Sequence, residues 1–423
     1  MWMTPASSIL RRFLLVIGLC LVPSTRAADL PVQTDASIRE VILRVARRQI
    51  QPLDDSDYPQ LESLENFRAI MQPKGIAWNY PWGVTLYGLL RASDATGDPE
   101  IGRFVLRHNE MVARDYVWLE GLRTRFAASG QSLRALTNGP MGRILALGSL
   151  DNCGAMGAQF LETFLRQTNG MTATQRQVGA VIADYITTKQ ARLPDGTLWR
   201  PERYGGTIWA DDLYMSCPFL ARWSQVTGDR RYLDDAARQI INMAARLQDK
   251  DGLWFHAYYP NEQKPAAFKW GRANGWAMVA MVEVLSAMPV DHPDRPKLLD
   301  LLKRQAEGAK AVQAPSGMWR QVLDQPECWE ETSVTAMFTY ALARAANRGW
   351  IDASNLAVAR RAFAGICQHV TPEGMVKDTC AGTSIGANLD FYLTRPHPDD
   401  DPHGRGPVML AGAELLLAGK GVK

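Results

Sequence analysis

Cysteine, net charge and long apolar runs are all scarce in this chain of 423 residues, and each scarcity excludes a class of protein. The six cysteines form no CxxC pair, which argues against zinc fingers and dense disulfide frameworks. Cys367 and Cys380 could pair in an oxidising compartment, but burial as small apolar side chains is the reading that we favour for the cysteines. No Ser/Gly-rich linker divides the chain, so we expect one large domain over residues 28–423.

The N-terminal 27 residues have the pattern of an export signal. Arg11 and Arg12 precede an apolar run from Phe13 to Val22, and small residues end the segment at Ala27. A membrane anchor is the alternative, but the run is much shorter than the roughly 20 residues that span a bilayer. The sequence therefore predicts a signal peptide over residues 1–27 and a periplasmic or extracellular protein.

The mature chain has almost no net charge. The formal charge of +3 falls to zero when Arg11, Arg12 and Arg26 leave with the signal. A neutral chain argues against a nucleic-acid or anionic-membrane partner that is held by bulk electrostatics.

Six short motifs recur at intervals of roughly 60 to 73 residues, each at the start of an apolar run. Repeats of this length indicate stacked or ring-closed supersecondary units. The motifs begin near Trp78, Asp151, Asp211, Asn274, Ser333 and Gly406.

Six further helices are expected between these motifs. Tyr232 to Leu247 is strongly amphipathic, with Asp234, Asp235, Arg238 and Arg246 opposite its apolar face, whereas 278–285 and 335–346 are apolar nearly all round. The first kind should lie outside and the second kind should be buried. The expected outer helices cover residues 37–53, 98–115, 174–192, 230–247, 295–312 and 353–370.

Glycine turns repeat in step with the helices. Thr-Gly-Asp at 96–98 and 227–229 offers a helix stop followed by a cap, and an xGxΦ turn occurs after outer helices at Gly196, Gly252, Gly317 and Gly374. Outer helix, turn, motif loop and buried inner helix thus form one unit. Since Leu410 to Leu417 is as apolar as the middle of the chain, the last unit is no polar cap. We therefore predict an all-α, ring-closed (α/α)6 barrel.

Ring closure would bring the six motifs to one mouth of the barrel. An aromatic cavity with a few clustered polar groups is typical of a ligand site, and aromatic faces with carboxylates and an arginine suit a carbohydrate. The side chains expected at this mouth are Asp151, Asp211, Asp212, His256, Trp270, Arg272, Asn274, Trp276, Glu330 and Glu331.

Each of these residues also has a structural interpretation. Asp151, Asp211 or Asp212 could simply be helix N-caps, and His256 could be a core histidine. Arg272 calls for a bidentate carboxylate partner, which could be a substrate or Glu330 or Glu331. Three tryptophans could be plain barrel core: Trp209, Trp276 and Trp329.

Three of the motifs carry a family resemblance. The stretches WADDLYM (209–215), WGRANGW (270–276) and ETS…AMF (331–338) resemble the unsaturated rhamnogalacturonyl hydrolases of glycoside hydrolase family 105, which are close to the unsaturated glucuronyl hydrolases of family 88. The resemblance covers residues 78–412. It implies a six-hairpin barrel that acts without metal or organic cofactor on lyase products, oligosaccharides that end in a Δ4,5-unsaturated uronic acid.

The same resemblance implies roles for individual residues. Asp211 would be the general acid and base, although the doubled Asp211-Asp212 leaves open which carboxylate enters the cavity, and Asp151 would be the second catalytic carboxylate. The resemblance also implies substrate contacts for His256, Arg272 and Trp276. Further candidate substrate-binding residues in the same motifs are Trp209, Trp270, Asn274, Ser333 and Thr332.

The chemistry fits an acid of raised pKa. Protonated Asp211 would deliver a proton to C4 and then, as a carboxylate, take one from the water that attacks C5. Arg272 would hold the uronate. Two other functions stay open: an inverting hydrolase of saturated glycosides that uses Asp151 and Asp211, and a carbohydrate-binding protein without activity.

Overall fold

The computed structural model describes residues 33–57 and 74–418. The predicted signal peptide lies outside these residues. In the described part of the chain, no helix is both long enough and apolar enough to cross a membrane.

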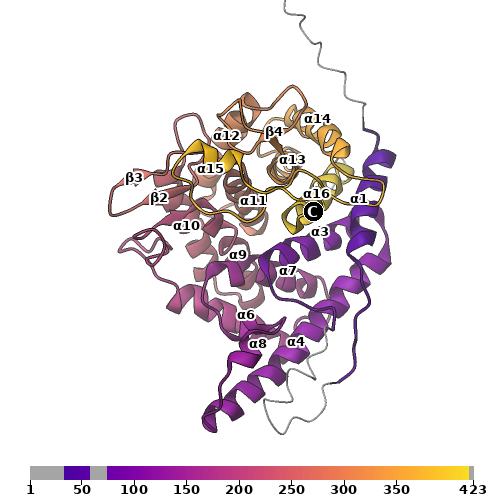
Figure 1. The fold of residues 1–423 in the computed structure, drawn as a ribbon, viewed down its shortest axis with the longest axis vertical. Coiled ribbons are helices and arrows are strands. Elements are labelled where there is room, and N and C mark those ends of the chain that lie inside the picture. Colours follow the sequence, from indigo (N-terminus) through magenta and orange to yellow (C-terminus); the bar gives the residue numbers. More distant parts are fainter. Residues whose placement is uncertain (1–32, 58–73, 419–423) are drawn as a thin grey trace, which may run out of the picture.

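Within the described residues, the main helices form an outer and an inner set, six in each (Figure 1). The outer helices are α1 (Asp35–Gln49), α4 (Pro99–Ala128), α8 (Ala173–Asp184), α10 (Arg231–Leu247), α12 (Arg295–Ala311) and α14 (Asn355–Gln368). The inner helices are α3 (Tyr80–Thr96), α7 (Gly154–Leu165), α9 (Cys217–Thr227), α11 (Gly271–Ala287), α13 (Thr332–Asn347) and α16 (Pro402–Leu416). Each outer helix precedes an inner one, so the chain forms six hairpins.

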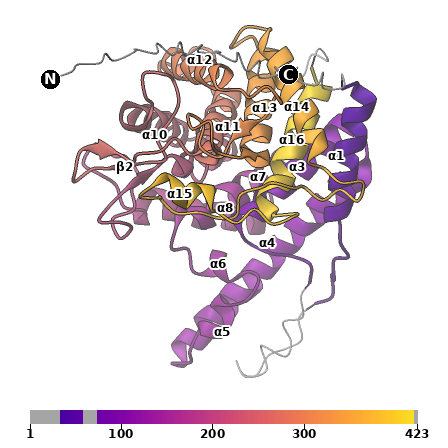
Figure 2. The ribbon, with the colours of Figure 1, turned by 45° about the horizontal axis from the view of Figure 1, so that its top comes forward.

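The inner helices form a closed ring. Each packs against the next one along the chain, and α16 packs against both α13 and α3. The last hairpin therefore completes the circle with the first, which confirms the predicted all-α (α/α)6 barrel. Outside the ring, the C-terminal part of α4 projects away from the barrel together with α5 (Arg134–Thr137) (Figure 2).

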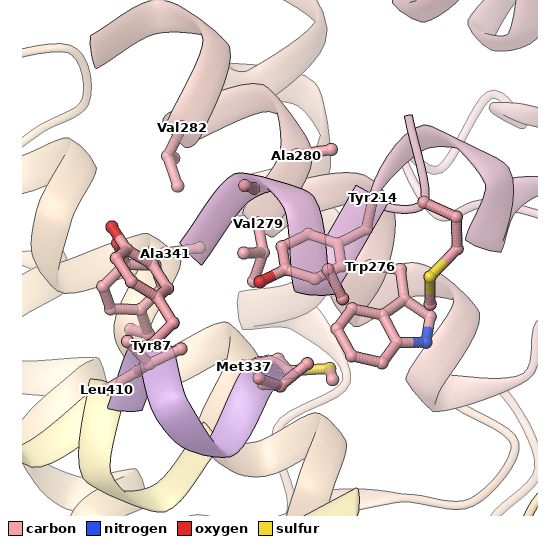
Figure 3. Close-up of a cluster of buried hydrophobic side chains, with 14 of the residues drawn as sticks. Tyr87, Tyr214, Trp276, Val279, Ala280, Val282, Met337, Ala341 and Leu410 are labelled. Carbon is pink, nitrogen blue, oxygen red and sulfur yellow. The ribbon is translucent and has the colours of Figure 1, made fainter. Parts of the chain in front are cut away.

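Burial separates the two sets of helices as the apolar patterns predict. Every residue from Gly271 to Leu285 and from Thr332 to Ala346 is buried. In the middle of the ring, Tyr87, Trp276, Met337 and Leu410 from four inner helices lie close together with Tyr214, which precedes α9 (Figure 3). The centre of the barrel is thus a packed core.

The repeated glycines occupy left-handed backbone positions. Gly97 and Gly228 end α3 and α9 with φ of 70° and 74°. In the xGxΦ turns, φ is 86° at Gly196, 85° at Gly252, 81° at Gly317 and 82° at Gly374. Glycine adopts this region without steric cost, so both predicted turn types are confirmed.

Short antiparallel strands lie between the outer and inner helices. One sheet pairs β1 (Ile208–Trp209) with β2 (Ala257–Tyr259) and β2 with β3 (Lys264–Pro265). A second sheet pairs β4 (Trp319–Arg320) with β5 (Glu330–Glu331). These strands fix the register of the motif loops against each other.

Several local predictions are corrected by the structure. Helix α4 continues to Ala128, well past the predicted residue 115, because apolar residues such as Tyr116, Leu119 and Leu122 remain buried. Asp235 does not face solvent but is buried, with a 2.7 Å ion pair to Arg192.

At the C-terminal end, α16 begins at Pro402 and includes His403 and Arg405. The cysteines of the described residues are free, Cys367 and Cys380 included, and all except Cys367 are buried.

Candidate active site

A chain of side-chain contacts joins all six motifs at one mouth of the barrel. Tyr80 at the start of α3 contacts His403 in α16 and the edge of Trp276 in α11. Trp276 stacks on Tyr214, which follows the 3-10 helix Ala210–Leu213 (Figure 3). Arg200 bridges Asp151 and Asp212, and Arg272 reaches Ser333. The predicted convergence of the motifs is therefore present in the structure.

None of the three aspartates Asp151, Asp211 and Asp212 is the N-cap of an inner helix. Asp151 lies in the 3-10 helix Leu150–Asn152, and Asp211 and Asp212 lie in Ala210–Leu213, each ahead of an inner helix. The N-cap positions of α7 and α9 belong instead to Cys153 and Ser216. The interpretation of these aspartates as N-caps is thus wrong, and both loops enter the mouth before the helix begins.

Arg200 distinguishes the two adjacent aspartates. Its guanidinium contacts Asp212 at 2.5 Å and Asp151 at 2.9 Å, and it lies 4.8 Å from the centre of the Trp209 ring. Asp212 is fully buried and its carboxylate is engaged in this ion pair, although burial raises the pKa of Asp212 against the effect of Arg200. Asp211 is the carboxylate that stays available for chemistry.

Asp211 lies in an environment that favours its protonated form. Its side chain is 14% exposed, and no described residue donates a hydrogen bond to its buried Oδ2. Burial raises the pKa of Asp211 to about 7, with Asp212 and Asp151 acting in the same direction and Arg200 and Arg272 opposing them. A carboxyl group with this pKa can both give and take a proton near neutral pH.

His256 lies close to the Asp211 carboxyl group. Pairing of Trp209 with Ala257, and the hydrogen bond from the Ala210 N–H to the His256 carbonyl, bring the two loops together. His256 Nε2 is then 3.7 Å from Asp211 Oδ2, and the imidazole ring packs between Trp209 and Trp270.

The His256 imidazole is neutral at working pH. Burial, together with the charges of Arg272 and Arg200, lowers its pKa to about 3. Nδ1 is 2.9 Å from the Tyr392 hydroxyl, whose oxygen accepts a hydrogen bond from the Gly386 N–H. The Tyr392 hydroxyl can therefore donate its proton to Nδ1 of His256. This favours the tautomer of His256 that carries its proton on Nε2, the nitrogen that faces Asp211.

Arg272 is buried on the same side of the mouth. Its Nη1 donates to the Cys380 carbonyl at 2.5 Å and its Nη2 to the Ala381 carbonyl at 2.8 Å, and its guanidinium lies 4.7 Å from the centre of the Trp270 ring. Glu331 is 3.8 Å away, so no carboxylate of the described residues forms a bidentate pair with Arg272. Glu330, the other candidate partner, accepts from the Ser316 hydroxyl instead.

The α13 residues lie behind Arg272. Glu331 caps this helix by accepting from the Val334 N–H at 2.6 Å, and it also accepts from the Ser333 hydroxyl and the Cys380 N–H. Thr332 is buried, and its hydroxyl has no hydrogen-bond partner among the described residues. Ser333 and Glu331 therefore hold the loop whose carbonyls bind Arg272.

The remaining predicted residues divide between aromatic side chains of the mouth and residues with a structural role. Trp209 and Trp270 are nearly fully buried and contact His256, whereas the equally buried Trp276 stacks on Tyr214. Asn274 uses its whole amide internally, since it accepts from the Trp254 N–H and donates to the carbonyls of Trp254 and Trp270. Trp329 stacks on His397 at 4.4 Å and is half-buried, so it is not plain core.

Sequence reasoning missed Arg200, Tyr80 and Tyr392. A signal for Arg200 was present, because it ends the stretch DGTLWR as His256 ends DGLWFH, at the corresponding place in the preceding unit. Tyr80 and Tyr392 carry no comparable repeat. Their roles depend on partners that lie far away along the chain.

Comparison with known proteins agrees with this geometry. The chain is 25% identical over 351 residues to the unsaturated rhamnogalacturonyl hydrolase YesR of Bacillus subtilis, covering 81% of this chain and 91% of that protein. It is 30% identical over 220 residues to an unsaturated 3S-rhamnoglycuronyl hydrolase of Alteromonas sp., covering 50% of this chain and 52% of that protein.

A solved structure has the same fold. It is a possible member of the GH105 family from Salmonella enterica, with a TM-score of 0.70, 23% identity and coverage of 91% of this chain and 94% of that one. The family model for Glycosyl Hydrolase Family 88 matches residues 42–418, nearly the whole described chain. The protein is thus a glycoside hydrolase that belongs to Glycosyl Hydrolase Family 88.

Proposed function

We propose that this enzyme removes a terminal Δ4,5-unsaturated uronic acid from lyase-generated oligosaccharides by hydrating the C4=C5 double bond. The observation that carries the proposal is the buried Asp211 carboxyl, whose Oδ2 has no described hydrogen-bond donor and whose pKa is raised to about 7. Vinyl-ether hydration needs a group of this kind, since one carboxyl must first donate and then accept a proton.

Asp211 performs both proton transfers. Its protonated form gives a proton to C4, and the positive charge that develops at C5 is shared with the ring oxygen. The resulting carboxylate takes a proton from the water that adds to C5. The hemiketal formed at C5 opens, the glycosidic bond is lost, and no covalent enzyme intermediate is required.

The neighbouring charges hold Asp211 in this role. Asp151, in contact with Arg200, keeps negative charge near Asp211 and opposes its ionisation. Arg272 places a positive charge beside the cavity that attracts the uronate, although two of its nitrogens already donate to backbone carbonyls. His256 supplies a neutral N–H donor, and the tryptophans supply apolar walls for the sugar ring.

The named relatives support the substrate class. One is an unsaturated rhamnogalacturonyl hydrolase and the other an unsaturated 3S-rhamnoglycuronyl hydrolase. We therefore expect a pectin-derived substrate of the rhamnogalacturonan type. The export predicted for residues 1–27 belongs to the same proposal, because such oligosaccharides arise outside the cytoplasm.

Ultraviolet absorbance tests the reaction directly, because hydration removes the alkene chromophore. The purified protein should abolish the absorbance of a lyase-generated rhamnogalacturonan disaccharide, with kcat/KM falling as the pH rises above about 7. Asp211→Asn should lower kcat by at least about a hundredfold. Asp300→Asn, which removes an exposed carboxylate of the outer helix α12, is the matched control and should behave like the wild type.

Two other results would overturn the proposal. Reducing sugar released from saturated glycosides without loss of absorbance would indicate an inverting hydrolase. Binding of the disaccharide without turnover, equally tight in wild type and Asp211→Asn, would indicate a carbohydrate-binding protein.

A further inference from the structure

The first and sixth motifs meet in a hydrogen-bonded chain that the proposed mechanism does not use. Tyr80 opens the first inner helix, and its hydroxyl is 2.5 Å from His403 Nε2, in the first turn of the last inner helix. His403 Nδ1 is in turn 2.5 Å from Asp401 Oδ1. His403 and Asp401 are both buried, so water competes little for these contacts.

The contacts fix the direction of each hydrogen bond. Asp401 caps α16 by accepting from the His403 backbone N–H, and the same oxygen accepts from ring Nδ1. The imidazole proton therefore lies on Nδ1, and Nε2 is the acceptor. Tyr80 donates its hydroxyl proton to Nε2, which leaves the lone pairs of its oxygen for another donor.

The imidazole keeps this state at working pH. Burial and the charge of Arg272 lower the pKa of His403 to about 4, although Asp401 opposes them. Four charged groups act on the Tyr80 hydroxyl. They are Arg272 of α11, Asp151 and Asp211 of the motif loops, and Asp401, the partner of His403. Burial raises the pKa of Tyr80, so its hydroxyl stays neutral.

Tyr80 lies next to the aromatic residues that adjoin the Asp211 loop. Its ring lies edge-on to Trp276 at 6.4 Å and 78°, and Trp276 stacks on Tyr214 in the loop that carries Asp211. The Tyr80 oxygen thus offers a fixed acceptor on the α3 side of the mouth, whereas Asp211 and His256 lie on the side of β1 and β2.

We propose that the Tyr80 oxygen accepts a hydrogen bond from the water that adds to C5, and that His403 and Asp401 position Tyr80 for this contact. The inference rests on the proposed function. One O–H of the water faces the Asp211 carboxylate and gives up its proton there, while the other is held by Tyr80. Tyr80 is then a catalytic residue, and His403 and Asp401 are positioning residues.

Tyr80→Phe tests the contact, assayed by absorbance loss on the same unsaturated disaccharide. We expect kcat to fall about tenfold or more, with KM within about twofold of wild type, because only a contact to the water is lost. The decline of activity above about pH 7 should stay in place, since Asp211 is unchanged. The proposal would be overturned if Tyr80→Phe had the kcat of the wild type, if only its KM changed, or if its activity declined at a different pH.

His403→Ala and the double variant test the positioning role. His403→Ala alone should lower kcat about as much as Tyr80→Phe, and His403→Gln, which can still accept from Tyr80, should recover most of that loss. Since His403 acts only through Tyr80, the double variant should be no slower than Tyr80→Phe. Additive losses would overturn the positioning role.

Tyr87→Phe is the matched control on the same helix. Tyr87 donates to the buried Glu283 away from the mouth, so its loss should lower Tm and leave kcat unchanged. A wild-type enzyme that turns over while Tyr80→Phe is fully active would disprove this inference and leave the proposed function intact. A wild-type enzyme without turnover would reject both.

Discussion

At the scale of single residues, the site depends on two adjacent buried carboxylates that differ in their partners, although burial raises the pKa of both. Asp212 is fixed by Arg200, whereas Asp211 faces a neutral imidazole and no described hydrogen-bond donor to its Oδ2. Which of the two enters the cavity was open from sequence, because the side-chain direction depends on Arg200, which lies outside the motif. The sequence predicted an aspartate at the mouth, but it could not predict which of the two carboxylates would be left without an arginine partner.

This contrast predicts opposite effects on stability for Asp211→Asn and Asp212→Asn. The pKa of Asp211 rises from 3.8 to about 7 on folding, so ionisation of the native state costs free energy. Asp211→Asn should therefore stabilise the protein, by an amount that grows from pH 3.8 to about 7 and is constant above. Asp212→Asn should lower the free energy of unfolding by about 3 kcal/mol, because Arg200 loses a buried partner.

Thermal unfolding between pH 4 and pH 9 measures both effects. A Tm of Asp211→Asn that equals the wild-type value at pH 8 would mean that Asp211 is not held in its protonated form at neutral pH. A stable Asp212→Asn would mean that Asp151 alone suffices for Arg200.

At the scale of elements, the turns decide where each motif lies. Gly252 combines a φ of +85° with a backbone so close to α12 that a Cβ would come within 2.0 Å of the Arg304 carbonyl oxygen. Lys269 adds ion pairs to Asp249 and Asp251 on either side of the turn. The turn therefore docks the outer helix and directs the segment that carries His256 into β2.

Gly252→Ala should destabilise the protein more than the same change at Gly97. Gly97 also has a left-handed backbone, with φ of +70°, but open space around its Cα, so alanine there should cost only about 1–2 kcal/mol. At Gly252 the steric clash adds to this cost, and we expect at least about 3 kcal/mol in urea unfolding. Equal losses at the two positions would contradict the close approach of Arg304.

The same scale shows what the sequence could predict. The inner helices and the glycine turns were predictable, since burial on all sides and a left-handed φ each require particular residue types. The 3-10 helices that carry Asp151 and Asp211 were not predictable. An aspartate before an apolar run looks the same in a sequence whether the α-helix begins at that residue or a few residues later.

At the scale of the whole molecule, the two ends of the barrel differ in chemistry. The mouth holds the carboxyl groups and aromatic rings, whereas the C-terminal ends of the inner helices enclose a buried ion network. Glu283 lies within this network, with hydrogen bonds from Arg222, Tyr87 and Tyr340 and a 3.8 Å ion pair with Arg344. The network closes the barrel at the end opposite to the reaction.

Glu283→Gln should weaken the fold in a pH-dependent way. Arg344 and Arg222 lower the pKa of Glu283 from 4.5 to about 2, against the effect of burial, so its contribution to stability is full above pH 4.5 and is lost as the pH falls toward 2. At pH 7 we expect a loss of about 3 kcal/mol in the free energy of unfolding, measured by denaturant titration. The loss should shrink at pH 3, and Glu262→Gln, on the surface hairpin, should have no measurable effect. A loss that does not vary with pH would contradict the ion network.

The contact between α3 and α16 has a consequence for how the enzyme matures. Tyr80 and His403 are separated by 323 positions, so the reactive pocket is assembled from the earliest and latest parts of the barrel. A nascent polypeptide still lacking its final helix would hold Asp211 and His256 but neither His403 nor the wall formed by α16. Catalytic competence should therefore arise in a single late event, and proteolytic clipping ahead of Pro402 should abolish turnover however well the other five hairpins survive.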